Sequence, residues 1–436
     1  MKDLIAYSSE RSADIRTQIG AEHYSYRFAE DAMVRLFDMA GYPTKYVSEP
    51  QIFKHRATYG GLLGVDSEQV VHIAFRSTGN IRPMMGARNI CHFAWEFDVL
   101  KDHGLVIDSV LSNQVHMLRL MDEVWVACSY TERVLRHHGL THVHVVPAPV
   151  VDESLPRRRS FIECLDLLGA IPTVPLLLSG ALPRERNAEL CEHRLAPVRQ
   201  HHALQDRLAG AENRIFLTVL NPADLRKNIL NLIEGFQMAV GPHARDLLIV
   251  KLIVPNKGDF RSTGLYDQVR PRCNGDMAYD DGRVLFILDY LTDPQMEALF
   301  SIADYYLSAT HCEGFNRPLL QAMSFGTVPI STANTAMADY IDTENAIVIA
   351  EKPYLGVIPR MAGDVAGLPY AVPVATRFDI ARACHAAIGQ EPDEYEGMAE
   401  HAAHTVLKKF GAPTILRAAE ARLAALRTAG SESAHV

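Results

Sequence analysis

Short apolar runs alternate with polar, helix-like segments along the first third of the chain. The runs lie at residues 69–75, 88–95, 122–129 and 141–150. Apolar runs of this length are typical of buried strands, and prolines end the last of them. The alternation predicts a parallel sheet covered by helices. We assign it to an N-terminal domain over residues 1–155.

A second alternating series begins near residue 214. Its clearest helix is expected at 224–239, where four apolar residues recur at the i, i+3, i+4 and i+7 positions. The strands expected in this series are 214–220, 246–254, 283–288, 304–310, 327–331 and 345–350. The pattern predicts a second α/β domain over residues 213–390. A cleft between two such domains, at the carboxyl ends of their strands, is a natural ligand site.

The two remaining segments differ in composition. Residues 156–212 are charged and mostly helical in character, which predicts a helical linker or insertion between the domains. Its basic triplet at 157–159 fits a solvated stretch, with contact to an anionic membrane surface as the alternative. Residues 391–436 are Ala-rich. We expect C-terminal helices there that return toward the N-terminal domain and end in a frayed tail.

Composition narrows the class of protein. A chain of 436 residues is too long for one compact core and predicts two or three domains. Its 43 basic and 52 acidic residues give a net charge of −9, which argues against a mainly electrostatic nucleic-acid binder. The seven cysteines are widely spaced, which argues against a disulfide scaffold or a cysteine zinc site. Without an apolar signal core or a run of about 18 apolar residues, a cytoplasmic protein is expected, with the inner face of the membrane as the alternative.

The stretch "HCEGFNRPLLQAMSFG" places polar residues where a strand passes into a helix. Gly314 would let the chain turn tightly, and Pro318 suits the first turn of the helix. Exposed N–H groups at such a helix start, together with the helix dipole, favour an anion such as a diphosphate. Glu313 lies in the loop and Gln321 one turn into the helix, so both can face the same ligand.

A second strand–loop–helix junction carries two cations, Arg226 and Lys227. Their charges complement phosphate oxygens, Arg as a fork and Lys as a point charge. Cations near a helix start oppose its dipole, and an anionic ligand would resolve that conflict. An Arg–Lys pair alone also fits a solvated face. Two such junctions in one α/β domain make the ligand-binding interpretation more specific.

At these residues the chain resembles the retaining, nucleotide-sugar-dependent glycosyltransferases of the group 1 type. Their E-x7-E motif usually stands within "EGFGLPLLEAMACGTPVI". Here the spacing is kept from Glu313 to Gln321, with Gln in place of the second Glu. Asn316 and Arg317 stand where Gly-Leu is common, and Arg317 fits an extra phosphate or sugar contact. The resemblance implies a GT-B architecture: two Rossmann-like domains that face each other across a cleft.

The resemblance also implies roles in the donor site. Arg226 and Lys227 would neutralise the leaving diphosphate, Glu313 would contact the donor sugar hydroxyls, and Gln321 the ribose. The other implied donor-site residues are Asp289 and Tyr290 at the base, and Gly314, Phe315, Asn316 and Arg317 in the loop. The donor is a nucleoside diphosphate sugar, and no metal or other cofactor is expected.

The N-terminal half resembles a bacterial polysaccharide-biosynthesis subgroup of these enzymes, through "NICHFAWEFD" and "DEVWVACS". The subgroup implies an acceptor side that comprises Gly20, Glu22, His23, Tyr24, His92, Trp95 and Glu96. Glu96 is expected as a catalytic or acceptor contact, and His92 is the alternative candidate for this role. The structural alternatives are a core Trp95 and a hydrogen-bonded core His92. A metal site at His142 and His144 lacks a third nearby ligand.

The expected function is transfer of a sugar from a nucleoside diphosphate sugar to a hydroxyl of a glycan or lipid-linked glycan, with retention, in cell-surface polysaccharide or glycoconjugate synthesis. A homo-oligomer and peripheral membrane contact are compatible with the sequence, and nucleic acid is not an expected partner. One alternative is a nucleotide-sugar epimerase or hydrolase on the same fold. Another is a catalytically degenerate scaffold that binds nucleotide sugar or glycan. Gln321 favours the scaffold, whereas Arg226, Lys227 and Glu313 argue against it.

Overall fold

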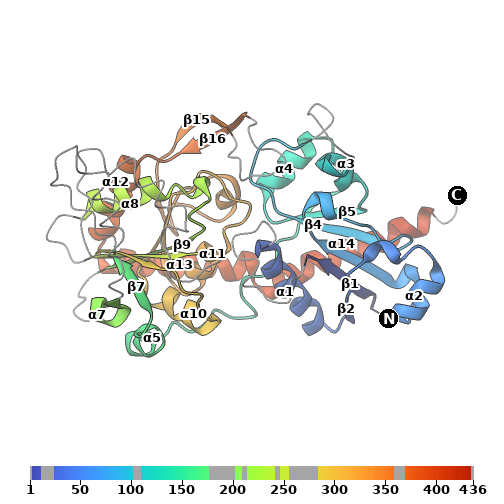
Figure 1. Cartoon of the computed structure of the whole chain (residues 1–436), viewed down its shortest axis with the longest axis horizontal. Helices are drawn as coiled ribbons and strands as arrows, with labels where there is room; N and C mark the ends of the chain where they lie inside the picture. Colours follow the sequence, from blue (N-terminus) through green and yellow to red (C-terminus); the bar gives the residue numbers. More distant parts are fainter. Residues whose placement is uncertain are drawn as a thin grey trace, which may run out of the picture.

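The chain forms two α/β domains that lie side by side, each built around its own sheet (Figure 1). The computed structural model describes residues 2–10, 24–101, 110–175, 202–208, 214–240, 246–254, 283–357 and 369–433. The first sheet has the order β2-β1-β3-β4-β5-β6, and all its pairs are parallel. Its strands are β1 Leu4–Ser9, β2 Thr44–Tyr46, β3 Val70–Phe75, β4 Arg88–Phe93, β5 Glu123–Val126 and β6 Val143–Val145.

The second sheet has the order β14-β13-β12-β9-β10-β11-β7-β8. Its parallel part comprises β9 Ile215–Leu220, β10 Leu247–Leu252, β11 Val284–Ile287, β12 Tyr305–Ser308, β13 Val328–Ser331 and β14 Ile347–Val348. Strand β9 lies between β10 and β12, so the chain reverses its winding there. Open parallel sheets bind ligands beside such a reversal, outside the carboxyl ends of their strands.

Helices cover both sheets (Figure 1). Those of the N-terminal part are α1 Tyr24–Met39, α2 Arg56–Leu63, α3 Gln114–Arg119 and α4 Ser129–His137. Later helices are α5 Phe161–Leu168, α7 Leu204–Leu208, α8 Ile229–Ala239, α10 Asp293–Ile302, α11 Arg317–Ser324, α12 Arg377–Ile388, α13 Pro392–Phe410 and α14 Ala412–Ser433. The 3-10 turns are η2 Pro50–Ile52, η3 Ser67–Gln69, η4 Thr78–Asn80, η5 Val110–Ser112, η6 Leu225–Lys227 and η8 Thr335–Asp339.

Helix α8 shows how the sequence pattern produces packing. Its four periodic apolar residues are all buried in one cluster against the sheet. The helix begins at Ile229, later than the expected residue 224, because Asn228 adopts a left-handed conformation with φ 53°. Asn is one of the few residues that tolerate this conformation, since its short side chain can bond locally.

The segment 156–212 differs from the expected helical linker. It contains α5 and α7, but it also forms β7 Pro172–Pro175 and β8 His202–Ala203. Strand β7 pairs antiparallel with β11, and β8 pairs with β7, so the segment extends the second sheet. The prediction of a mostly helical linker or insertion missed these two strands, because short strands between helices leave little periodic signal.

Each arginine of the basic triplet 157–159 has a partner in the protein, although Arg157 and Arg158 remain exposed to solvent. Arg158 Nε donates to the carbonyl of Ser301 at 2.9 Å, and Arg159 forms an ion pair of 2.7 Å with Glu297. Arg157 bonds to Glu163 at 2.6 Å. The triplet therefore fastens α5 and its preceding loop to α10 of the second domain.

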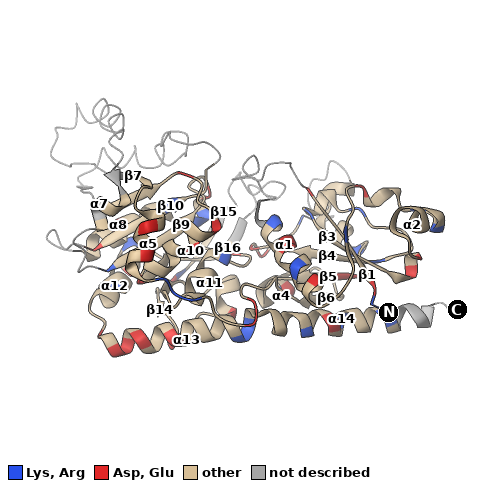
Figure 2. Cartoon of the chain, turned by 90° about the horizontal axis from the view of Figure 1, so that it is seen from below, with Lys and Arg blue, Asp and Glu red and all other residues tan. Residues whose placement is uncertain are grey.

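The C-terminal helices join the two domains. Figure 2 shows α13 beneath the second domain and α14 running on beneath the first. Ile415 and Leu423 of α14 pack in the same core cluster as Phe37 of α1 and Trp125 of β5. Arg422 Nε donates to Glu123 at 3.1 Å. Helix α14 is thus part of the N-terminal domain's core, although it is distant in sequence.

A hairpin forms a second link between the domains. Strands β15 Lys352–Val357 and β16 Pro369–Val374 pair antiparallel near the top of Figure 1. Val372 of β16 packs with Phe97 of the first domain and Cys312 of the second. The Ala371 N–H donates to Asp98 at 3.2 Å. These contacts close one end of the space between the domains.

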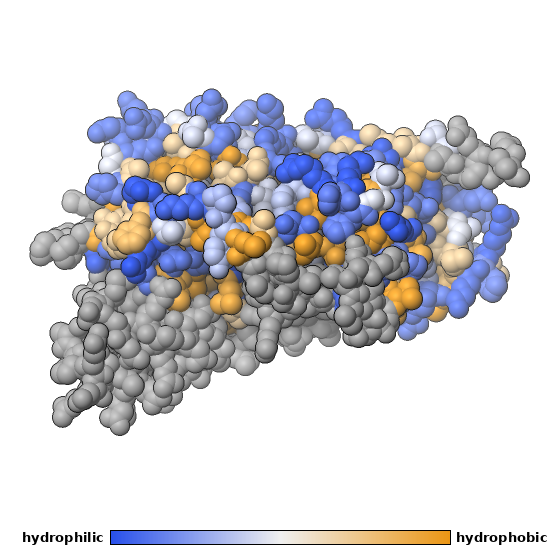
Figure 3. Space-filling view, turned by 90° about the horizontal axis from the view of Figure 1, so that it is seen from above, coloured by the Kyte–Doolittle hydropathy of each residue, from blue (hydrophilic) through white to orange (hydrophobic). Residues whose placement is uncertain are grey.

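On the face in Figure 3, hydrophilic side chains are interspersed with apolar patches. Among the larger apolar side chains, Tyr354 and Leu355 on β15 are well exposed. No helix in the described ranges combines the length and the apolar character that crossing a membrane requires.

Candidate functional site

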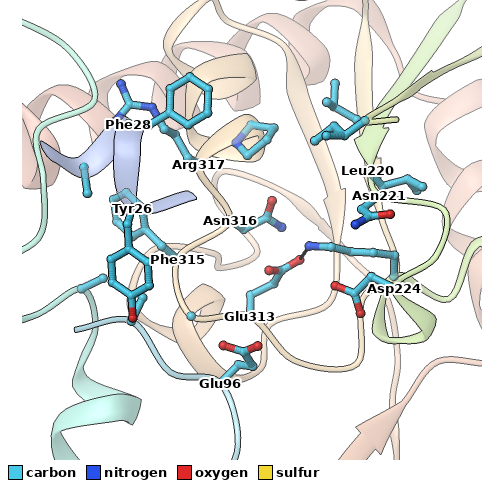
Figure 4. Close-up of a pocket in the computed structure, with 18 of the residues that line it drawn as sticks. Tyr26, Phe28, Glu96, Leu220, Asn221, Asp224, Glu313, Phe315, Asn316 and Arg317 are labelled. Carbon is cyan, nitrogen blue, oxygen red and sulfur yellow. Dashed lines mark hydrogen bonds and ion pairs between the residues drawn. The ribbon is translucent and has the colours of Figure 1, made fainter. Parts of the chain in front are cut away.

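A cleft of about 700 Å³ lies between the two domains. The second domain contributes residues at or just beyond the carboxyl ends of β9, β10, β11 and β12, and the first domain contributes those around the end of β4. In Figure 4, Glu96, Asp224 and Glu313 converge on the middle of the cleft, while Phe28 and Arg317 lie together at one end. The fold thus assembles side chains from distant parts of the chain at the strand ends.

The loop after β9 places two cations in the cleft. Asp224 accepts a hydrogen bond from the Arg226 N–H at 3.2 Å and so caps η6. The amide of Asn228 donates to the carbonyls of Ala309 and Ala375 at 3.1 and 2.9 Å. These bonds hold the left-handed residue that separates η6 from α8. Arg226 and Lys227 are therefore fixed just before the helix start.

The loop after β12 is held in a similar way. Asn316 is left-handed, with φ 60°, and its amide donates to Ser308 Oγ at 3.1 Å. The Glu313 N–H donates to Thr335 Oγ1 at 2.8 Å, and the Tyr340 hydroxyl donates to the Phe315 carbonyl at 2.9 Å. Rigid anchoring of this kind keeps the start of α11 open toward the cleft.

Gly314 lies at a bend of the chain, where its loop approaches the first domain closely. Its φ lies outside the left-handed region. A Cβ at this position would lie 3.3 Å from the Trp95 nitrogen and 3.4 Å from a Glu96 carboxylate oxygen. Glycine therefore lets the loop after β12 approach the first domain closely.

The two cations are already paired with carboxylates. Arg226 forms ion pairs with Glu96 from the first domain and with Asp224, the latter at 2.7 Å. Lys227 forms an ion pair with Glu313. The Arg226 guanidinium also lies 5.4 Å from the centre of the Phe97 ring. Five charged groups thus form one network that spans the two domains.

Burial and charge compete in this network. Burial raises the pKa of Glu96, although Arg226 opposes the shift. Burial also tends to raise the pKa of Asp224, but the charges of Arg226 and Lys227 outweigh it and leave that pKa lowered. For Arg226, burial acts to lower the pKa, yet Glu96 and Asp224 hold it well above its ordinary value. Arg226 consequently stays charged, and Glu96 is the carboxylate that burial affects most unfavourably.

The first domain contributes a largely aromatic wall. Trp95 donates its indole N–H to the Val99 carbonyl at 2.9 Å and stacks on Phe93, with 5.8 Å between ring centres. It is half-buried and lines the cleft, so it serves both packing and the site surface. His92 also lines the cleft, and burial lowers its pKa to about 4. Neither of its ring nitrogens has a hydrogen-bond partner among the described residues.

The other expected residues differ in their placement. Tyr290, Arg317 and Gln321 line the cleft, whereas Asp289 does not belong to its lining. Arg317 Nη1 lies 3.4 Å from the Pro149 carbonyl, on the side of the first domain. Tyr24 is the first residue of α1. Three expected acceptor-side residues lie outside the described residues: Gly20, Glu22 and His23.

Several lining residues were missed from the sequence. Tyr26 and Phe28 follow Tyr24 on α1 and reach the cleft, but nothing in their local pattern marks them. Asp224 was also missed, although it lies only two positions before Arg226. Lys251 had the clearest signal, because a lysine interrupts the apolar run "LLIVKL" of β10. Within the described residues, no group of three His, Cys, Asp or Glu side chains is arranged to hold a metal ion.

Neither a protein-family model nor a curated protein matches this chain. Solved structures match its fold across almost its whole length. Anabaena HepE in complex with UDP and glucose covers 97% of this chain and 100% of its own, with 12% identity and a TM-score of 0.55. Sucrose-phosphate synthase of Thermosynechococcus elongatus covers 98% and 100%, with 13% identity and a TM-score of 0.58. A glycosyltransferase of Rickettsia africae covers 98% of both chains, with 13% identity and a TM-score of 0.54. At these identities the likeness establishes the fold, and the GT-B architecture expected from the sequence is confirmed.

Proposed function

We propose that this protein is a glycosyltransferase that moves a sugar from a nucleoside diphosphate sugar to a hydroxyl of a glycan acceptor. The observation that carries the proposal is the convergence of Arg226, Lys227 and Glu313 at the carboxyl ends of β9 and β12, in a cleft between two domains. This is where an open parallel sheet binds nucleotides. The fold shared with structures that contain UDP supports the same assignment.

The donor is assigned to the second domain. Lys227 and Arg226 face the diphosphate, beside the N-terminal end of α11, where the helix dipole favours an anion. Glu313 accepts hydrogen bonds from the sugar hydroxyls and Gln321 from the ribose. The base lies beside Tyr290 and the neighbouring Asp289. The loop residues Gly314, Phe315, Asn316 and Arg317 enclose the sugar and phosphate end.

The reaction cleaves the bond between the anomeric carbon and the diphosphate oxygen. Charge accumulates on that oxygen in the transition state, and the preorganised cations stabilise it there. For Arg226 and Lys227 to do so, the incoming diphosphate exchanges places with part of the carboxylate network. An acceptor hydroxyl forms the new bond on the same face of the sugar, and its proton passes to the leaving phosphate. The configuration is then retained.

The acceptor is assigned to the first domain, whose aromatic wall suits the apolar faces of a sugar. Glu96 lies at the boundary between the two ligands and acts as a catalytic or acceptor contact. His92 is neutral at physiological pH and can accept or donate a hydrogen bond. Exclusion of water by the paired domains limits wasteful hydrolysis of the donor. We place the reaction in cell-surface polysaccharide or glycoconjugate synthesis, in the cytoplasm or at the inner face of the membrane.

The test measures release of nucleoside diphosphate from UDP-, GDP- and ADP-sugars with and without a panel of glycan acceptors. We expect release with one base, stimulation by an acceptor, and a product whose anomeric configuration in an NMR spectrum matches the donor. Release that acceptors do not stimulate would indicate a hydrolase, and interconverted sugar nucleotides an epimerase. Nucleotide binding without turnover would favour the scaffold.

A further inference from the structure

Lys251 is a buried cation in the wall of the cleft. It lies within β10, between Val219 of β9 and Ile287 of β11, and only 6% of its surface is exposed. Its neighbours on the same face of that strand, Ile249 and the partly buried Ile253, belong to the core cluster beneath α10 and α11. Lys251 nevertheless lines the cleft. A charge in this position is costly unless a partner compensates it.

The cations Arg226, Lys227 and Lys251 differ in the number of carboxylates with which they pair. Arg226 is paired with two carboxylates and Lys227 with one. Across the described part of the chain, no carboxylate lies within 4.0 Å of Lys251, and its Nζ donates to the carbonyl of Leu252 at 2.5 Å. One neutral acceptor leaves two of the three ammonium protons without a described partner. Lys251 therefore differs from Arg226 and Lys227 in that its described acceptor is a neutral carbonyl and theirs are carboxylates.

The nearby walls do not supply a compensating charge. Gln321, on the α11 side of the cleft, is neutral where a Glu would place a carboxylate. The acidic group that acts on Lys251 from β11 is Asp289, which raises its pKa, but burial dominates and lowers the pKa to about 8. Burying a charged lysine in the wall of a cleft costs free energy. A ligand that carries negative charge would offset this cost and so explain the lysine.

We propose that Lys251 is an anion-binding residue that contacts the phosphate charge of the nucleotide donor. The inference rests on the proposed function and refines its donor site. Arg226 and Lys227 must leave carboxylate partners before they can bind phosphate fully, whereas Lys251 needs no such exchange. The ligand class is a nucleoside diphosphate or its sugar, and Lys251 supplies charge beyond the recognised Arg–Lys pair.

The proposal predicts a pH dependence. Below about pH 8 Lys251 is protonated, and above it the free protein loses this charge, so donor affinity should fall as pH rises from 7.5 to 9.5. The other charged groups that line the cleft are Glu96, Asp224, Arg226, Lys227, Asp293, Glu313 and Arg317. Asp289, beyond β11, acts on Lys251 from outside the lining. Arg in place of Lys251 would remain charged in this range. The Lys251→Arg variant should therefore lose the pH dependence.

The experiment is calorimetric titration of wild type, Lys251→Met and the exposed control Lys54→Met. The probes are UDP-glucose, GDP-glucose, ADP-glucose, the matching nucleosides and inorganic pyrophosphate. We expect Lys251→Met to bind the preferred nucleotide sugar and pyrophosphate about 10- to 100-fold more weakly, as for loss of a charged hydrogen bond. Nucleoside affinity should not change. The melting temperature of the unliganded variant should equal or exceed that of wild type, because a buried charge is removed.

Each contrary result has a distinct meaning. Unchanged nucleotide-sugar and pyrophosphate affinity in a folded Lys251→Met protein would overturn this inference and leave the proposed function standing. An equal loss for nucleoside and nucleotide would place Lys251 at the base or ribose and would also overturn it. A lower melting temperature with unchanged affinity would assign Lys251 a structural role. Absence of nucleotide-sugar binding in the wild type would contradict both proposals.

Discussion

The two walls of the cleft are built from different chemistry. The wall of the first domain combines aromatic rings, among them Tyr26, Phe28 and Trp95, with small and polar side chains, and Glu96 is its carboxylate in the charge network. The wall of the second domain carries alternating positive and negative side chains on two loops, each fixed by a left-handed asparagine. Under the proposed function, the first wall faces the acceptor sugar and the second faces the leaving diphosphate.

The same contrast appears in how the walls are anchored. The charged loops are tied by hydrogen bonds to neighbouring strands, such as those from Asn228 to Ala309 and Ala375. The aromatic wall is held mainly by ring packing, as between Trp95, Phe93 and Phe97. Charges need fixed positions to stabilise a transition state. Ring packing tolerates adjustment to different acceptors.

The charged wall should be the more sensitive to substitution. Lys227→Met removes the cation that faces Glu313 and is expected to lower kcat about 10³-fold, because charge on the leaving phosphate loses its stabilisation. Steady-state transfer rates measure this, with Lys54→Met as the surface control. A loss below about threefold would show that Lys227 does not act on the leaving group.

Substitution of Glu96 probes the charged contact between the two walls of the cleft. Glu96→Gln is expected to lower kcat about 10²-fold through loss of a carboxylate near the reacting groups. The same change frees Arg226 from one of its two anionic partners, so binding of nucleoside diphosphate should become a few-fold tighter. Rate measurements combined with calorimetric titration separate the two effects. Weaker diphosphate binding would contradict the competition between Glu96 and the ligand.

Two histidines on adjacent strands of the first domain, His72 on β3 and His92 on β4, can be compared directly. His72 is hydrogen-bonded to Ser8 at 2.9 Å and Asn89 at 3.0 Å, whereas His92 lacks described partners and lines the cleft. We expect His72→Ala to lower the unfolding free energy by about 1–3 kcal/mol with little effect on transfer per folded molecule. His92→Ala should instead lower transfer about 10-fold at smaller cost in stability. Urea unfolding and initial rates test both, and the reverse ranking would assign His92 to the core.

The smallest expected effect concerns Glu351, which accepts a hydrogen bond from Asn334. Burial raises its pKa from 4.5 to about 7. Between these pH values the folded state keeps a proton that the unfolded state has lost, so its contribution to the unfolding free energy declines as pH rises. Glu351→Gln should remove this decline in urea titrations at pH 5, 6 and 7. A wild-type profile parallel to that of the variant would refute the shift.

The sequence predicted the fold where local pattern and tertiary structure agree. The apolar runs at 69–75, 88–95 and 214–220 became β3, β4 and β9. Strand β1 was missed, because "LIAYSS" ends in two serines that look like a loop. Both serines are buried, and Ser8 is bonded to His72 on the neighbouring strand. A long-range hydrogen bond of this kind leaves no periodic trace.

The charged part of the site was accessible from the sequence because motifs place it on two loops. Its pairing was not: Glu96 and Arg226 lie 130 positions apart, and only the packing of the domains brings them together. The close approach of Gly314 to the opposite domain was equally hidden, because the atoms nearest to a Cβ there belong to Trp95 and Glu96. Tyr26 and Phe28 reach the cleft only through the placement of α1. Such residues are determined by the tertiary structure and not by local pattern.

The most direct test of the central claim is the change in melting temperature of the purified protein with millimolar UDP, GDP, ADP, CMP and their sugars. A ligand that binds only the folded state must raise this temperature. A nucleotide-sugar site in the cleft predicts a clear rise in melting temperature with one nucleoside diphosphate and its sugar. The rise should be lost in Lys227→Met. No rise with any of these ligands, in a protein that melts cooperatively, would contradict a nucleotide-sugar site in the cleft.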